Sequence, residues 1–234
     1  MTAAEPPTRC REIERKFRVP PDVERRLLAL GASLVSRKTF VDTYYDTEDY
    51  FLCLRDHWLR LRGSDENNAW ELKHRRKGDA SCAAAATAYR EVRGDAQIMA
   101  TLGEVLPQTR LVKDVSRVSD LVANGTLREL AVITTVRKTF KAPAGNAVVD
   151  IDETDWGFSV GEIEVVLVES DDGSDLQAGA VEGATAEISA LSAQLGVDEE
   201  GPPPEGKVES YLRLRRPELY YRLLDCVWSR HTAK

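Results

Sequence analysis

Glu12-Ile-Glu-Arg-Lys-Phe17 alternates charged and apolar side chains near the start of this 234-residue chain. Side chains two apart project from the same face of a β-strand, so this segment places two carboxylates and an ammonium on one face. Ile13 and Phe17 lie on the other face. A hydrophobic core does not accept the charged face, which therefore predicts a strand that borders a polar site.

Pairs of acids with the same spacing recur late in the chain. Each pair encloses an isoleucine, so each predicts a strand with carboxylates on one side and apolar residues on the other. Carboxylate oxygens are the ligands that hard divalent cations prefer. The pattern predicts one oxygen-rich metal site, formed by Glu12 and Glu14, Asp150 and Asp152, and Glu162 and Glu164.

Short runs rich in aromatic and β-branched residues predict about eight strands, a number that can close into a barrel. The strands are predicted at residues 9–19, 39–46, 58–62, 69–75, 88–93, 133–140, 147–152 and 158–168. Helices are predicted at residues 23–30, 95–106, 175–195, 207–214 and 217–228. Residues 79–86 are predicted to form a mobile loop, and residues 198–206 a linker inside one domain.

Charged residues share one face on almost every predicted strand, and apolar residues occupy the other. The apolar faces must pack against helices, which leaves the charged faces to line a cleft or an enclosed space. The charged faces carry Glu12, Glu14, Lys16, Asp42, Tyr44, Asp46, Trp58, Arg60, Arg62, Glu71, Lys73, Arg75, Tyr89, Glu91, Arg137, Asp150, Asp152, Glu162 and Glu164.

A cavity lined by both signs of charge is costly unless a ligand and metals complete the pairing. Polyphosphate with Mg²⁺, or with Mn²⁺ in its place, meets that need, because Arg and Lys bind phosphoryl oxygens and carboxylates hold the metal. No Gly-x-x-x-x-Gly-Lys-Ser/Thr phosphate loop occurs in the chain. The residues thus predict a phosphoryl-transfer site of another type.

Each motif has a simpler interpretation when it is taken singly. Glu-x-Glu-x-Lys also fits a solvated strand face in a chain with 30% charged residues. Arg60 and Arg62 could protect an edge strand from aggregation, and Tyr44 and Trp58 could be core aromatics. Solvent-exposed strands, however, do not place charged residues at every second position on so many strands. The motifs taken together therefore favour a shared binding or catalytic site.

Composition narrows the class of protein. The formal net charge of −7 argues against nonspecific nucleic-acid binding, which needs a basic face. No apolar run approaches the roughly 20 residues of a membrane span, and the first residues lack a signal-peptide core. Cys10, Cys53, Cys82 and Cys226 are widely spaced, which predicts reduced thiols and no zinc knuckle. We therefore expect a cytoplasmic protein without membrane or nucleic-acid partners.

The motifs together resemble the CYTH, or triphosphate tunnel metalloenzyme, superfamily from about residue 12 to residue 207. The shared motifs are Glu12-Ile-Glu-Arg-Lys16, Arg60-x-Arg62, Glu71-x-Lys73, Arg137-Lys138, Asp150-x-Asp152 and Glu162-x-Glu164. Within that superfamily the thiamine triphosphatases are most similar. This similarity rests on Asp42-Thr-Tyr-Tyr-Asp-Thr47, His57-Trp-Leu-Arg60, Trp70-Glu-Leu-Lys73, the segment 155–164 and the tail 216–224.

The resemblance implies an α+β fold, a closed antiparallel eight-stranded tunnel with surrounding helices. It implies a single domain over residues 1–234, with a core at about 9–215 and a C-terminal helix at about 217–228, and we expect a monomer. The activity implied is Mg²⁺-dependent hydrolysis of thiamine triphosphate, the small-molecule substrate, to thiamine diphosphate and phosphate.

Residue roles are implied by the same resemblance. Arg60, Arg62, Lys73, Arg137 and Lys207 would bind the triphosphate, and Asp150, Glu162 and Glu164 would hold metal with help from Asp152. Lys16 and Tyr44 would assist the attack of water, and Trp58 would contact the thiamine rings. Glu12 and Glu14 would lie near the substrate or a second metal.

Three alternatives remain open from the sequence: a cyclase acting on ATP, an inorganic tripolyphosphatase, and a noncatalytic polyphosphate-binding module. The protonation of Lys16 is open as well. Neighbouring arginines disfavour its charged form and neighbouring carboxylates favour it.

Overall fold

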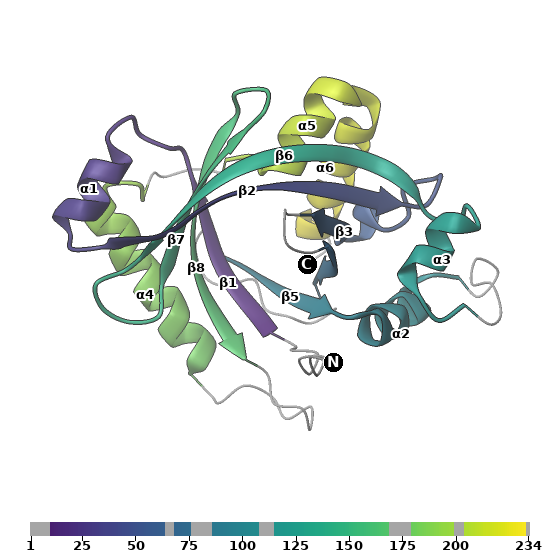
Figure 1. Cartoon of the computed structure of the whole chain (residues 1–234), viewed down its shortest axis with the longest axis horizontal. Coiled ribbons are helices and arrows are strands. Elements are labelled where there is room, and N and C mark those ends of the chain that lie inside the picture. Colours follow the sequence, from purple (N-terminus) through teal and green to yellow (C-terminus); the bar gives the residue numbers. More distant parts are fainter. Residues whose placement is uncertain are drawn as a thin grey trace.

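Eight strands close into a barrel in the computed structural model, which describes residues 10–63, 68–75, 86–107, 115–168, 179–198 and 204–232. The order around the barrel is β1-β5-β4-β3-β2-β6-β7-β8, and β8 pairs with β1 to close it (Figure 1). Every neighbouring pair is antiparallel. The strands are β1 (Cys10–Phe17), β2 (Ser33–Asp46), β3 (His57–Gly63), β4 (Asn68–His74), β5 (Thr87–Arg93), β6 (Arg128–Lys141), β7 (Val148–Thr154) and β8 (Ser159–Val168). The predicted α+β class and the closed eight-stranded barrel are confirmed.

Strands β2 and β6 are longer than the sequence predicted. Each has 14 residues, and they pair from Ser33 opposite Lys141 to Asp46 opposite Arg128. The prediction missed the first six residues of β2 because most of them are exposed, including Leu34 and Val35. An exposed ribbon has no buried face, so its sequence lacks the alternation that marks a half-buried strand.

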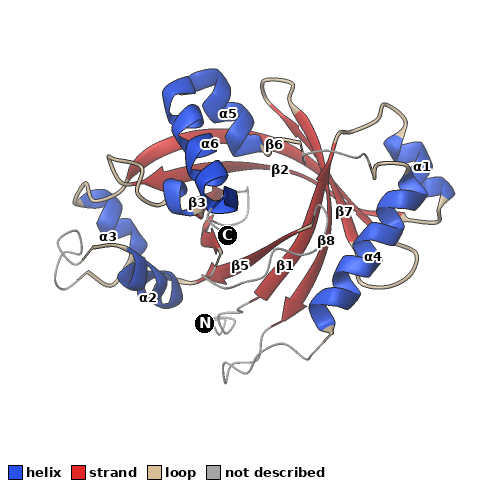
Figure 2. Ribbon diagram, turned by 180° about the vertical axis from the view of Figure 1, so that it is seen from behind, coloured by secondary structure: helices blue, strands red, loops and turns tan. Residues whose placement is uncertain are grey.

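Helices cover the barrel in three groups (Figure 2). Helices α1 (Val23–Ala29) and α4 (Ala180–Leu195), which correspond to the helices predicted at 23–30 and 175–195, pack on one side, and residues 169–178 lie outside the described part. Helices α2 (Asp95–Val105) and α3 (Val118–Ala123) form a second group. The sequence did not predict α3, which has only six residues. Helices α5 (Lys207–Arg215) and α6 (Pro217–Thr232) form the third, and side chains in α6 are described up to residue 226.

Two predicted connections lie largely outside the described residues. They are most of the loop at 79–86 and the central residues of the linker at 198–206. The four-residue turn between β3 and β4 is also outside. None of the helices in the described part is both long and apolar enough to cross a membrane.

The apolar faces of β1, β7 and β8 pack outward against helices α1 and α4. Ile13, Val149 and Ile163 are fully buried in the cluster that includes Leu27 of α1 and Ile188 of α4. Each fully buried aliphatic side chain contributes about 1.5–3 kcal/mol to folding. Because side chains alternate along a strand, this outward packing turns the charged faces into the barrel. The hydrophobic core therefore forms a shell around a polar interior.

Candidate active site

The three acid pairs predicted from the sequence lie on three adjacent strands. In the β1–β8 pairing Glu14 is opposite Glu164 and Lys16 is opposite Glu162, and in the β7–β8 pairing Asp150 is opposite Glu162. The carboxylates that lie far apart in the sequence therefore share one wall of the barrel interior. Most of them are paired with cations.

Glu164 has no ion pair or hydrogen bond to its side chain among the described residues. Burial, together with the negative charges of Glu12 and Asp150, raises the pKa of Glu164 to about 8. A half-buried carboxylate in such surroundings gains from a cation placed between it and its acidic neighbours. The all-oxygen donor set fits a hard divalent cation rather than a transition metal that prefers nitrogen or sulfur.

Arg60 and Arg62 lie on β3 and are held by acids from both neighbouring strands. Arg62 forms two hydrogen bonds of 2.7 Å to the carboxylate of Asp42 on β2. Arg60 donates to Glu71 on β4, with Nη2 2.6 Å from Oε2, and its Nη2 lies 3.6 Å from Glu91 on β5. Burial opposes ionisation of Asp42, but the two arginines lower its pKa to about 2. Both guanidinium groups are thereby fixed in the barrel interior.

Arg137 and Lys207 approach the acids of β7 from the other side. Arg137 on β6 binds both oxygens of Asp152 at 2.6 Å, and its Nη1 lies 2.5 Å from Asp150. Lys207, the first residue of α5, also forms an ion pair with Asp152. Burial lowers the pKa of Lys207 in spite of this partner. Thr139 donates a further hydrogen bond of 2.6 Å to Asp150.

Lys16 on β1 and Lys73 on β4 lie in the wall that β1, β5 and β4 form. The Nζ atom of Lys73 lies 2.6 Å from Glu12 and 2.5 Å from Glu14. Burial opposes ionisation of Glu12, yet Lys73 lowers its pKa to about 2. Lys16 forms ion pairs with Glu14 and Glu162. Although burial acts against the charged form, these two carboxylates raise the pKa of Lys16 well above its usual range. In this arrangement Lys16 is an ammonium donor.

Phe40 on β2 underlies three of the cations. The guanidinium carbon of Arg62 lies 4.2 Å from the ring centroid, that of Arg137 lies 5.6 Å from it, and the Nζ atom of Lys207 lies 5.4 Å from it. Cations at these distances from an aromatic face are stabilised by the ring quadrupole.

Tyr44 and Trp58 lie near the arginines. Arg60 donates a hydrogen bond to the Tyr44 hydroxyl at 3.4 Å, and burial raises the pKa of Tyr44. No hydrogen bond joins Lys16 to Tyr44 among the described residues, so their joint role in the attack of water stays a prediction. Trp58 is half-buried and is opposite Lys73 in the β3–β4 pairing.

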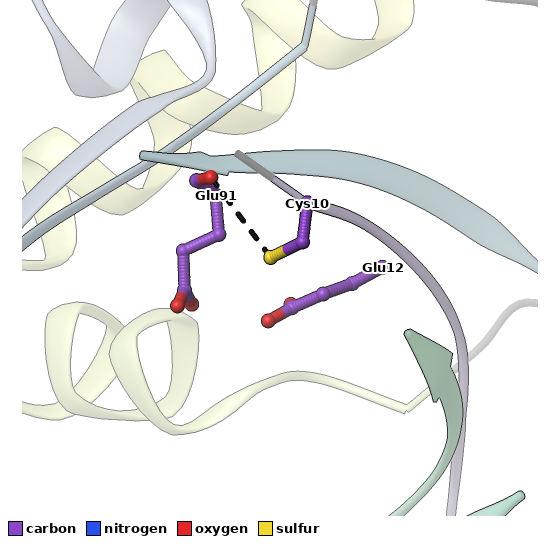
Figure 3. A group of neighbouring side chains, drawn as sticks. All are labelled: Cys10, Glu12 and Glu91. Atoms are coloured by element: carbon purple, nitrogen blue, oxygen red, sulfur yellow. Dashed lines mark hydrogen bonds between the residues drawn. The ribbon is translucent and has the colours of Figure 1, made fainter. Parts of the chain in front are cut away.

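Cys10, Glu12 and Glu91 bring a sulfur and two carboxylates together at the start of β1 (Figure 3). The thiol donates to the backbone carbonyl of Glu91 at 4.0 Å. Burial and the charge of Glu91 raise the pKa of Cys10 to about 12, so the sulfur stays protonated and is a poor metal ligand. Cys10, Cys53 and Cys226 are free thiols, as predicted, and Cys82 lies outside the described part.

Residues 10–199 match the family model of the CYTH domain. The chain belongs to the CYTH family. CYTH relatives with assigned activities include the thiamine-triphosphatase of Homo sapiens, which is 37% identical over 227 residues and covers 94% of this chain and 91% of its own length. The thiamine-triphosphatase of Macaca fascicularis is 36% identical over 222 residues, with 92% and 89% covered.

The fold of this CYTH chain also recurs among solved structures. The PH1819 protein of Pyrococcus horikoshii superposes with a TM-score of 0.57 over 87% of this chain and 99% of its own, at 17% identity. At that identity the similarity concerns the fold alone.

Three acids of the CYTH barrel that bind its arginines, Asp42, Glu71 and Glu91, were not assigned a role from the sequence. Their parity already placed them on the charged faces. Alternation along a strand shows which face a residue lies on, but not which residue it contacts. The ion pairs could therefore be identified only once the order of the strands in the barrel was known. The contact of Phe40 with the cations was not predicted either, because an aromatic residue in a strand is most often part of the core.

Proposed function

We propose that this CYTH protein hydrolyses thiamine triphosphate to thiamine diphosphate and phosphate, with Mg²⁺ as cofactor. The observation that carries the proposal is a buried interior in which fixed arginines and lysines face carboxylates from three adjacent strands. The identity to two thiamine-triphosphatases over most of the chain supports the choice of substrate.

The cationic side chains would bind the triphosphate. Arg60, Arg62 and Arg137 are held by carboxylates, with which the triphosphate would compete for their N–H groups, and Lys73 and Lys207 add point charges. Donors held in place before the reaction stabilise the charge that develops on the phosphoryl oxygens without further reorganisation. These residues would therefore lower the barrier as well as bind the substrate.

The metal would be held by Glu164 and Glu162 together with Asp150, and by Asp152, Glu14 or Glu12. Mg²⁺ bound there supplies Lewis-acid stabilisation of the reacting phosphoryl group. The observation behind this assignment is the Glu164 carboxylate, which lacks a cationic partner among the described residues and lies amid other acids.

Lys16 and Tyr44 would act on the attacking water and the terminal phosphoryl group. With its raised pKa, Lys16 is protonated at neutral pH and would donate a hydrogen bond to a phosphoryl oxygen. It can accept a proton only when Glu14 and Glu162 are engaged elsewhere. The Tyr44 hydroxyl, oriented by Arg60, would position the water.

A substrate screen tests the proposal. The purified protein is incubated with thiamine triphosphate, inorganic tripolyphosphate and ATP, each with Mg²⁺ and with excess chelator, and phosphate and cyclic AMP are measured. We expect Mg²⁺-dependent phosphate release, fastest from thiamine triphosphate. Cyclic AMP formation, a preference for tripolyphosphate, or binding without turnover would each replace the proposal with one of the three alternatives.

We also propose that the chain acts as a cytoplasmic monomer with a single domain and without nucleic-acid or membrane partners. These statements rest on the composition and the motifs and stay predictions. Sedimentation of the purified protein would test the oligomeric state.

A further inference from the structure

Asp56 joins two aromatic side chains at the edge of the cationic cluster. The indole Nε1 of Trp58 donates a hydrogen bond of 3.0 Å to Asp56 Oδ1, and the hydroxyl of Tyr89 donates one of 3.1 Å to the same oxygen. Trp58 belongs to β3 and Tyr89 to β5, which are separated by β4. A single carboxylate oxygen thus ties together two aromatic residues from strands that do not pair with each other.

The other oxygen of Asp56 faces a cation. Arg75 Nε lies 3.4 Å from Asp56 Oδ2, and the guanidinium carbon of Arg75 lies 5.1 Å from the ring centroid of Tyr89. The side chain of Asp56 is only 16% exposed, so its bonds are shielded from water. A carboxylate with both oxygens engaged and little exposure holds its partners more firmly than a surface pair.

The backbone also fixes Asp56. It ends the short helix η1 (Cys53–Arg55) in the left-handed conformation, with φ 63° and ψ 40°, and its N–H donates to the carbonyl of Cys53. The preceding turn is held by the buried carboxylate of Asp46, which accepts from the backbone N–H groups of Leu52 and Cys53 at 2.8 Å. Aspartate and asparagine tolerate the left-handed region better than other side chains do.

The aromatic pair adjoins the proposed phosphate-binding residues. The Nζ atom of Lys73 lies 5.3 Å from the Tyr89 ring centroid, and Trp58 shares a strand face with Arg60. A triphosphate bound to these cations would place its organic end beside the two rings. Burial and the charge of Asp56 raise the pKa of Tyr89, so its hydroxyl remains a donor.

We propose that Asp56 is a positioning residue that sets selectivity for the organic end of the substrate by holding Trp58 and Tyr89 as one aromatic surface. The inference rests on the proposed function. Both rings are amphipathic, and a ring whose polar atom is tethered has fewer orientations to lose on stacking. Arg75 offsets much of the charge of Asp56, so Asp56 acts by accepting hydrogen bonds rather than by attracting the thiazolium.

Two substitutions at one position separate these effects. Asp56→Gly removes the carboxylate and keeps the left-handed backbone free of strain. Asp56→Asn keeps a carbonyl oxygen that can accept both hydrogen bonds, but removes the charge. Thermal unfolding of both variants establishes that they fold. Steady-state kinetics with thiamine triphosphate are then compared with inhibition by inorganic tripolyphosphate, which lacks the organic end.

We expect Asp56→Gly to lower kcat/KM for thiamine triphosphate about tenfold, mainly through KM, because contacts to the organic end are made before and during the reaction. The inhibition constant of tripolyphosphate should change by less than about twofold, since the phosphate-binding residues are untouched. Asp56→Asn should retain most of the wild-type selectivity. Equal losses in Asp56→Asn and Asp56→Gly, or equal effects on both ligands, would overturn the inference.

A variant without the two donors provides the decisive control. Trp58→Phe combined with Tyr89→Phe keeps an aromatic ring at both positions but removes both hydrogen-bond donors to Asp56, so adding Asp56→Gly should have no further effect on kcat/KM. A further tenfold loss in that background would show that Asp56 acts elsewhere. Absence of thiamine triphosphate hydrolysis by the wild type would instead refute the proposed function.

Discussion

Glu164 makes the metal-free barrel sensitive to pH. The pKa of this carboxyl is raised from 4.5 to about 8 by burial and by its acidic neighbours. In the unfolded chain the same group ionises near pH 4.5, so between pH 4.5 and pH 8 the folded protein binds a proton that the unfolded chain has lost. The stabilisation is fully present below pH 4.5 and is lost as the pH rises toward 8.

The size of the effect follows from the shift. A difference of one pKa unit corresponds to about 1.4 kcal/mol, so the shift from 4.5 to about 8 sets a ceiling of about 5 kcal/mol. Unfolding by urea in excess chelator, at pH 5.5 and at pH 8.5, measures the change in the free energy of unfolding. Glu164→Gln is the matched variant, because a neutral amide of the same shape does not titrate.

We expect wild type to lose at least about 2 kcal/mol more than Glu164→Gln over this interval. Mg²⁺ added at pH 8.5 should restore wild type and stabilise the variant much less, because the amide is a weaker ligand for a hard cation. The reasoning is refuted if both proteins respond to pH in parallel, since the pH dependence would then come from other groups.

Three further substitutions, two of them paired with a control substitution, test the site and the barrel. Arg137→Ala should reduce kcat by more than about tenfold in protein that is still folded at the assay temperature, although the loss of this partner of Asp152 also lowers the melting temperature. Arg128→Ala, on the exposed end of the same strand, should leave kinetics unchanged. Trp58→Ala should weaken hydrolysis of thiamine triphosphate roughly ten- to thirtyfold and spare inhibition by tripolyphosphate; equal effects on both would return Trp58 to a core role. Gly161→Ala should destabilise the fold in urea by about 1–3 kcal/mol, because the new methyl group would lie 2.1 Å from the Phe17 ring, while Gly183→Ala in α4 meets nothing within 4 Å and should be neutral or stabilising.

Alternation in the sequence predicted strands such as β1, β7 and β8 because each has a buried outer face. The helix at residues 207–214 was predicted as well, and it brings Lys207 to the acids of β7. What escaped prediction lacks a local signal. Helix α3 is too short to show a clear helical periodicity. The exposed half of β2 has no buried face, so its sequence does not alternate between apolar and polar residues. The hydrogen bond from Tyr89 to Asp56 joins residues 33 positions apart, so only the closed barrel reveals it.

The cations and the carboxylates of the barrel interior form ion pairs with each other, and these pairs affect how ligands bind. In the structure described above, Arg62 is bound by Asp42 and Arg137 by Asp152, so an incoming triphosphate exchanges partners with these acids rather than meeting vacant cations. Each carboxylate released from Arg137 or Lys73 becomes available to a divalent cation, and each carboxylate taken by the cation releases an arginine or a lysine for phosphate. Substrate and metal should therefore bind cooperatively, and linkage requires each to strengthen the other by the same factor. Triphosphate alone would leave the carboxylates without partners, and the metal alone would leave the arginines and lysines without partners. The barrel should therefore recognise the metal–triphosphate complex as a unit.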